Sequence, residues 1–116
     1  MRKFIKGFSF AFQGLIDSIK TQVNMRFHLF ALFAVTAAGV FFEITKAEWL
    51  IVLLCFAIVI GTELLNTAIE HLANAVTTEF NPFIKKAKDA AAAAVLWVSL
   101  ITALIGLWIF LPYLFN

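Results

Sequence analysis

Long apolar runs alternate with short polar stretches along the chain, and three of the runs are long enough to cross a bilayer. They predict membrane-spanning helices at about residues 27–44, 49–70 and 90–112, because about 20 apolar residues cover a hydrocarbon core of about 30 Å. The second helix is expected to continue to about residue 76, before a loop that Pro82 interrupts. The pattern predicts an all-α membrane protein with a single domain over residues 1–116.

A different pattern precedes the first span. In residues 2–22, apolar side chains recur at helical spacing and lysines and other polar residues fill the positions between them. The apolar positions are Phe4, Ile5, Phe8, Phe12, Leu15, Ile16 and Ile19. A helix with aromatic rings on one side and lysines among its polar residues is typical of an amphipathic helix on an anionic membrane surface. The alternative is a helix packed against another element in water.

The second span carries polar side chains toward its end. Glu63, Asn66, Thr67, Glu70 and Asn74 follow one another at i, i+3, i+4, i+7 and i+11, so all five line one helix face. The two carboxylates lie about 10 Å apart along the axis. A polar face cannot lie against lipid at low cost, so it must face protein or a water-filled site.

Three thin spans offer little interior in which to hide this polar face. If the chain stood alone, the face is expected to meet lipid. The third span begins with five alanines, Ala90–Ala94, which would let a helix of another subunit approach closely. The sequence therefore predicts an oligomer.

Composition and charge narrow the function classes. Hydrophobic residues make up 63% of the chain and charged residues 14%, against about 25% charged in soluble domains. The net charge is only +2, and the sequence has no basic patch interleaved with aromatic residues. Both features argue against a nucleic-acid partner. Cys55 is the single cysteine, so neither an internal disulfide nor a cysteine metal cluster is expected.

The distribution of Lys and Arg predicts the orientation. Eight of the nine basic residues precede the first span or separate the second from the third, and only Lys46 lies on the other side. The positive-inside rule places the N-terminus in the cytoplasm and the C-terminus outside. Glu63 then lies about 21 Å from the start of the second span, still within the hydrocarbon core, and Glu70 near the cytoplasmic surface.

Ionisable residues within a membrane helix are functional candidates by default. Glu63 could act as a general base, or could pair with Asn66 and fix helix packing. Glu70 could be an ordinary solvated acid, and Lys85, Lys86 and Lys88 could bind phosphate or only signal topology. Neither a Walker loop nor a nucleophilic triad is present. His28 and His71 are interpreted as isolated surface histidines.

The motif Glu63-x-x-Asn66-Thr67-Ala68-Ile69-Glu70, followed by Ala87-Lys88-Asp89 and an alanine-rich span, resembles the prokaryotic diacylglycerol kinase and undecaprenol kinase family. The resemblance covers nearly the whole chain, and Asn24-Met25-Arg26-Phe27-His28 is similar to the undecaprenol kinase branch. It implies a homotrimer in the bacterial cytoplasmic (inner) membrane, with sites shared between subunits. The implied enzyme is a phosphotransferase of phospholipid biosynthesis that uses MgATP to phosphorylate the hydroxyl of diacylglycerol or undecaprenol.

The resemblance also implies a role for individual residues. Glu63 matches the catalytic base, Asn66 its partner in the motif, and Glu70 a carboxylate that holds the Mg²⁺ carried by ATP. The positions that match nucleotide contacts are Lys3, Phe10, Glu79, Phe80, Asn81, Lys88 and Asp89.

The chain departs from the family pattern at three positions. Gln22 stands where many members have a second metal-binding Glu, Asn74 where the motif continues to Asp, and Ala92 where some members have a lipid-contacting Ser. Two alternatives therefore stay open. The chain could be a non-enzymatic membrane protein that uses Glu63 for proton or cation binding or for assembly, or a kinase-like chain that lost activity with Gln22.

Overall fold

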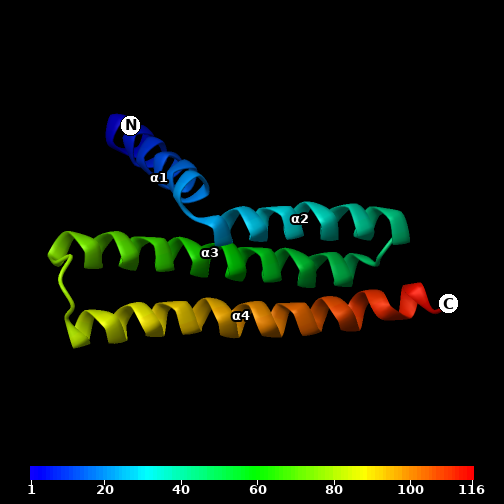
Figure 1. The fold of residues 1–116 in the computed structure, drawn as a ribbon. Helices are drawn as coiled ribbons and strands as arrows, with labels where there is room; N and C mark the ends of the chain where they lie inside the picture. The colour runs from blue at the N-terminus through cyan, green and yellow to red at the C-terminus, as the bar shows by residue number, and fades with distance from the viewer.

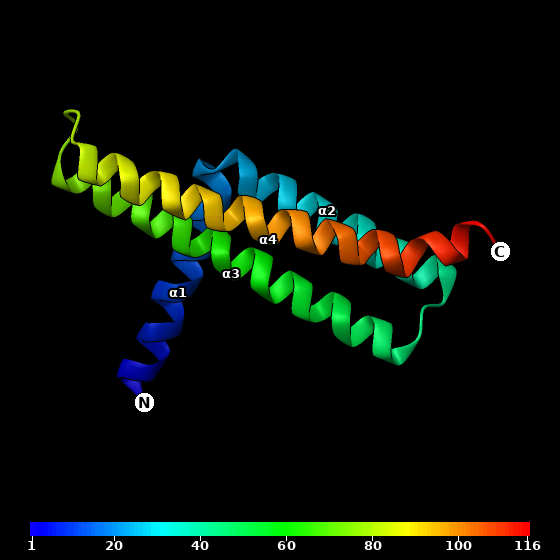
Figure 2. The ribbon, with the colours of Figure 1, turned by 90° about the horizontal axis from the view of Figure 1, so that it is seen from below.

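Four α-helices joined by short connections make up the chain (Figure 1). The computed structural model describes all 116 residues, and its helices are α1 (Arg2–Thr21), α2 (Val23–Phe42), α3 (Lys46–Val76) and α4 (Pro82–Leu114). The last three lie side by side and run antiparallel, whereas α1 diverges from them (Figures 1 and 2). The all-α class predicted from the sequence is confirmed, and α2, α3 and α4 are each long and apolar enough to cross a membrane.

The helices α3 and α4 are longer than a bilayer requires. With 31 and 33 residues, they measure about 46 and 50 Å at about 1.5 Å per residue, against a core of about 30 Å. Their connected ends project beyond the junction of α1 with α2 (Figure 1). This projecting hairpin carries the lysines of α4 and the polar end of α3.

The start of α4 differs from the prediction. The sequence placed the third span from about residue 90, after the lysines, whereas the helix α4 begins at Pro82 and includes the lysines. Two local signals explain the early start: the Asn81 side chain accepts hydrogen bonds from the backbone N–H of Phe83 and Ile84, and proline is favoured in the first turn of a helix. Lys85, Lys86 and Lys88 therefore lie on a rigid helix.

At the opposite end, α2 turns sharply into α3. Glu43 has a φ of 54°, and the N–H groups of Glu43 and Ile44 bond to the carbonyls of Val40 and Gly39, the two bonds of a Schellman motif. Thr45 and Glu48 then form a capping box at the start of α3. Ile44, Val52 and Ile109 form a small apolar core there, against which Val35 and Phe42 of α2 pack. This core connects all three helices.

Gly39 permits this close packing. A Cβ atom at this position would lie 2.6 and 2.8 Å from two ring carbons of Trp49. We expect Gly39→Ala to displace the ring and to destabilise the protein by about 1–3 kcal/mol, the usual penalty of overpacking. The melting temperature in detergent micelles measures the loss. Gly106→Ala is the matched control, because a Cβ there meets nothing within 4 Å; an equal melting temperature for both variants would contradict the packing argument.

The junction of α1 with α2 fixes the angle between them. Gln22 is extended, with φ −116° and ψ 115°, and the Arg26 side chain donates from Nη1 to the carbonyls of Ile19 and Lys20 at 3.3 and 3.1 Å. These bonds satisfy carbonyls that a helix end leaves free. The C-terminal end of α1 is thereby held at the bundle, whereas its N-terminal end points away from it (Figure 2).

Candidate functional site

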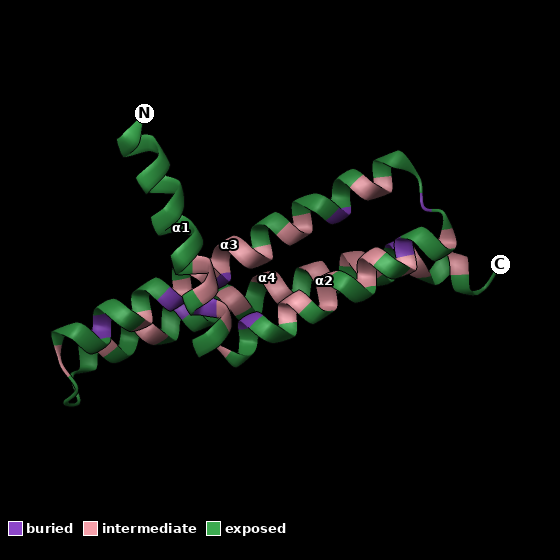
Figure 3. Cartoon of the chain, turned by 90° about the horizontal axis from the view of Figure 1, so that it is seen from above, coloured by how far each residue is buried: buried purple, intermediate pink, exposed green.

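Buried residues gather where the end of α1 and the start of α2 cross α3 (Figure 3). Ser18 of α1 is fully buried there, and its hydroxyl lies 3.0 Å from the hydroxyl of Thr67 of α3, which also donates to the carbonyl of Glu63. Met25 of α2 is also fully buried. The crossing therefore encloses the middle of the polar face of α3.

Glu63 lies in this crossing with 0% of its side chain exposed. Neither carboxylate oxygen has a hydrogen-bond partner. The nearest cationic or basic group is the imidazole of His28 on α2, whose Nε2 lies 3.5 Å from Oε2. A buried carboxylate without donors is unusual, because leaving such a group unpaired is unfavourable. Because both oxygens of Glu63 lack a donor, the carboxylate can still accept a hydrogen bond from a substrate hydroxyl.

One expectation from the sequence was wrong at this point. The polar face was predicted to meet lipid in a single chain, yet Glu63 and Thr67 are buried within one chain. The physical reason is that the C-terminal end of α1 crosses α3, and Ser18 supplies a polar partner that helical periodicity within α3 could not reveal. Further along, Glu70 keeps 33% of its side chain exposed, so the polar face opens toward its end.

The interpretation of His28 as a surface histidine was also wrong, whereas His71 lies on the surface as interpreted but is not isolated. The side chain of His28 is only 11% exposed and faces Glu63. His71 is half exposed, and its Nε2 lies 2.9 Å from Oδ2 of Asp17 on α1. The spacing along the sequence is 35 residues for one pair and 54 for the other, so no local pattern signals either contact.

A second polar group lies about two turns beyond Glu63. Lys88 of α4 places its Nζ 3.6 Å from Oε2 of Glu70 and donates a hydrogen bond of 2.8 Å to Oδ1 of Asn74. Asn74 therefore holds Lys88 beside Glu70. An ammonium group and a carboxylate that both remain about one-third exposed form a suitable site for a phosphate chain with its metal ion.

The other residues that were predicted to contact the nucleotide are spread along the surface. Asp89 binds Lys85 at 2.6 Å, Asn81 caps α4, and Glu79 and Phe80 are exposed in the connection before it. Lys3 and Phe10 are exposed on α1, which leaves the bundle toward its N-terminus (Figure 2). The structure brings Glu70, Asn74 and Lys88 together, but it shows no contact between this group and either residue of α1.

Three further positions named from the sequence, Asn66, Gln22 and Ala92, make no side-chain hydrogen bond to the groups described above. Asn66 is partly buried, and its Oδ1 has no hydrogen-bond partner, so its amide is available beside Glu63 on the same helix face. Gln22 lies at the break between α1 and α2 and is partly buried. Ala92 is exposed on α4.

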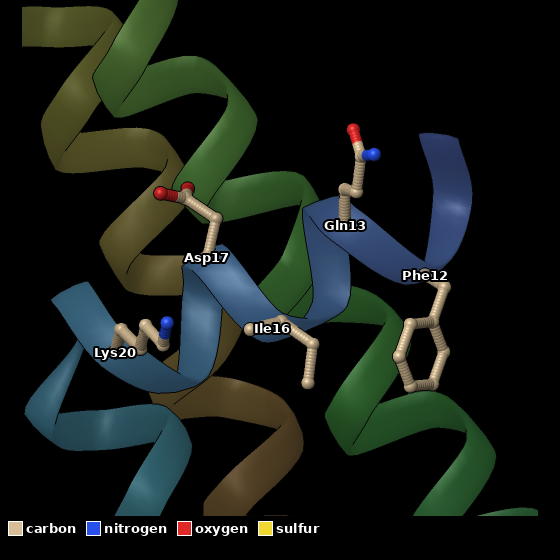
Figure 4. A pocket seen from close by; sticks show the side chains of 5 residues that line it. All are labelled: Phe12, Gln13, Ile16, Asp17 and Lys20. Atoms are coloured by element: carbon tan, nitrogen blue, oxygen red, sulfur yellow. The ribbon is translucent and has the colours of Figure 1, made fainter. Parts of the chain in front are cut away.

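A shallow hollow opens on α1 itself, beside the crossing with α3 (Figure 4). Its lining residues are Phe12, Gln13, Ile16, Asp17 and Lys20. None of them was predicted to contact nucleotide, and Asp17 is engaged with His71. This hollow therefore gives no independent indication of where ATP would bind.

The donor set fits a magnesium ion that arrives with ATP better than a resident metal centre. No group of three or more His, Cys, Asp or Glu side chains is arranged to hold a metal ion. Mg²⁺ usually keeps several waters and binds through one or two carboxylates together with substrate phosphates. Glu70 can supply one such carboxylate, and the amide oxygen of Gln22 is the weaker second candidate.

Proteins with known names are similar to this chain in sequence. Residues 9–110 match the family described as prokaryotic diacylglycerol kinase. The chain belongs to this family. It is 41% identical to undecaprenol kinase of Bacillus subtilis over 114 residues, which cover 98% of this chain and 93% of the relative. It is 36% identical to diacylglycerol kinase of Helicobacter pylori over 98 residues, or 77% of this chain and 75% of the relative.

A third kinase is similar over a smaller part of its own length. Diacylglycerol kinase of Synechocystis is 32% identical over 110 residues, which are 94% of this chain and 63% of that protein. The family resemblance recognised in the motif around Glu63 and Glu70 is therefore confirmed.

Proposed function

We propose that the protein transfers the γ-phosphoryl group of MgATP to the hydroxyl of a membrane lipid, either undecaprenol or diacylglycerol. The observation that carries the proposal is the buried, unpaired carboxylate of Glu63, two helical turns from the exposed pair of Glu70 and Lys88. One end of this polar face suits an alcohol that arrives within the membrane, and the other suits a charged nucleotide that arrives from water.

Each residue has a distinct part in the proposed reaction. The Glu63 carboxylate accepts the proton of the lipid hydroxyl while the alcohol oxygen attacks the γ-phosphorus, and Asn66 orients the alcohol through its free amide. Lys88, held by Asn74, neutralises phosphate charge, and Glu70 would hold the Mg²⁺ that accompanies ATP. Phosphoryl transfer needs little covalent chemistry from the protein, so positioning and charge neutralisation supply most of the catalysis.

The same geometry supports an orientation with the N-terminus in the cytoplasm. The start of α4, which carries the lysines, and the start of α2 lie toward the same end of the bundle, away from the C-terminus (Figure 1). The charge distribution assigns this end to the cytoplasm. Phe4, Ile5, Phe8 and Phe12 of α1 are exposed in the single chain. We infer that α1 lies on the cytoplasmic face of the bacterial inner membrane with these rings in the lipid.

The divergence of α1 supports a composite site in a homotrimer. Lys3 lies toward the end of α1 that points away from its own α3 and α4 (Figure 2). If Lys3 and Phe10 bind nucleotide, they therefore do so at the Glu70 and Lys88 of a neighbouring subunit.

An assay of lipid phosphorylation tests the proposal. The purified protein is incubated in lipid micelles with radiolabelled MgATP and either undecaprenol or diacylglycerol, and the labelled lipid is separated and counted. We expect undecaprenol to be phosphorylated faster, because the similarity to the relative named undecaprenol kinase extends over nearly the full length of both chains. Faster labelling of diacylglycerol would reverse the substrate assignment, and no labelled lipid would favour a non-enzymatic or inactive protein.

Gln22 offers a separate test of the metal site. If this position faces the metal, Gln22→Glu adds an anionic oxygen, which a hard cation such as Mg²⁺ prefers to an amide oxygen. We expect the Mg²⁺ concentration for half-maximal rate to fall. Gln13→Glu is a matched control, because Gln13 lies on α1 in the hollow beside Asp17. An unchanged Mg²⁺ dependence in the Gln22→Glu variant would remove Gln22 from the metal site.

A further inference from the structure

We propose that His28 is the positioning residue of Glu63 and the group through which the proton of the lipid hydroxyl leaves the buried site. The inference deepens the proposed kinase function and rests on it. It is carried by the approach of the His28 Nε2 to within 3.5 Å of a carboxylate that is cut off from water.

A base that is fully buried has to release the proton that it takes. The Glu63 side chain is 0% exposed, and neither of its oxygens has a hydrogen-bond partner through which a proton could pass. Unless the proton leaves, the carboxyl group stays neutral and cannot accept a proton in the next turnover. The site therefore needs a neighbouring group that can both accept and release a proton near neutral pH, which is the characteristic chemistry of histidine.

The position of His28 meets this need. Its side chain lies beside the fully buried carboxylate and is itself 11% exposed, so it connects the carboxylate with the surface. The ring of Phe27 packs edge-on against it, with centroids 5.8 Å apart, which limits the orientations of the imidazole. The distance of 3.5 Å to Oε2 is slightly beyond a hydrogen bond of about 2.7–3.2 Å, and catalytic contacts of this kind commonly tighten when substrate binds.

The other charged groups of the four helices near this region are engaged elsewhere or exposed. They are Asp17 paired with His71, Arg26 bound to carbonyls of α1, Glu70 beside Lys88, and the exposed Lys20. His28 is the ionisable group that lies within 4.0 Å of the Glu63 carboxylate. A proton on Glu63 therefore has one direct acceptor in the chain.

The proposed transfer balances without a further reactant. The O–H bond of the lipid alcohol breaks, its proton joins the Glu63 carboxylate, and the alcohol oxygen forms the bond to the γ-phosphorus as the bond to ADP breaks. The carboxyl proton then passes to Nε2 of a neutral His28 imidazole, which restores the carboxylate. The imidazolium finally releases a proton to water at its exposed side, and both groups return to their starting states.

Two variants of His28 test the inference in the full-length protein. His28→Gln keeps an amide near the Nε2 position but cannot relay a proton, and His28→Ala removes the side chain. We expect kcat to fall about 10- to 100-fold in both, the range for groups that act through a catalytic residue, with little change in KM for lipid or MgATP. Added imidazole should restore part of the rate of folded His28→Ala, a recovery that a purely structural role does not produce.

His71→Gln, at the other histidine, is the matched control, because His71 lies beside Asp17 and not beside Glu63. It should keep the wild-type kcat, and added imidazole should not raise its rate.

The possible results separate the inference from the kinase proposal. A wild-type protein that phosphorylates lipid, together with a folded His28→Ala protein whose rate added imidazole does not raise, would overturn the role of His28 and leave the kinase function intact. An unchanged kcat in folded His28→Gln would do the same, as would a rise in KM alone. A wild-type protein without lipid product would overturn both proposals.

Discussion

Replacing Glu63 by Gln is expected to reduce lipid phosphorylation at least ~100-fold, the lower end of what general acid–base catalysis contributes. The amide has nearly the same size and shape as the carboxyl group but cannot accept the proton of the lipid hydroxyl. Because Glu63 is fully buried with both oxygens unpaired, no neighbouring carboxylate is in place to substitute for it. The rate of labelled lipid formation at saturating MgATP measures the loss.

Folding should survive this substitution, since a neutral group is easier to bury than a charged one. The melting temperature and oligomer size of Glu63→Gln in detergent are therefore expected to equal or exceed those of the wild type. Glu43→Gln is the matched control, because Glu43 is exposed at the opposite end of the bundle, and it should retain the wild-type rate. A folded Glu63→Gln protein with near-normal turnover would refute the assignment of Glu63 as base.

Sequence periodicity was sufficient to predict the features that lie along one helix. Glu63 and Glu70 share a face of α3 because helical spacing alone places them there, and the three apolar runs predict three long helices by length. The start of α4 was missed although its signals are local. Asn81 before Pro82 is a helix-start pattern, but Pro82 was interpreted as part of the loop and the third span was counted only from about residue 90.

The contacts between helices were beyond any local pattern. Ser18 meets Thr67 and His28 meets Glu63, and each pair depends on how α1 and α2 cross α3. That crossing is set by the extended conformation of Gln22 and by the bonds from Arg26 to the end of α1. Since these features could not be read from spacing, the burial of Glu63 within one chain was not foreseen.

Mixing two disabled chains should restore activity if the site is shared between subunits. One chain carries Glu63→Gln, and the other carries Lys3→Ala together with Phe10→Ala; each is expected to be poorly active alone. In a randomly mixed symmetric trimer, a shared site works when Glu63 comes from the second chain and α1 from the first. This combination occurs in about one quarter of the sites of an equal mixture, which sets the expected recovery.

The direction of α1 is the physical reason for this expectation. Its C-terminal part is fixed to α3 of the same chain through Ser18 and Asp17, while the end that carries Lys3 extends away from the bundle (Figure 2). A matched control mixes wild-type chains equally with chains that carry all three substitutions. Shared sites then retain about one quarter of the wild-type rate and sites within one chain about one half. Retention of half the rate, with no recovery in the first mixture, would show that each subunit builds its own site.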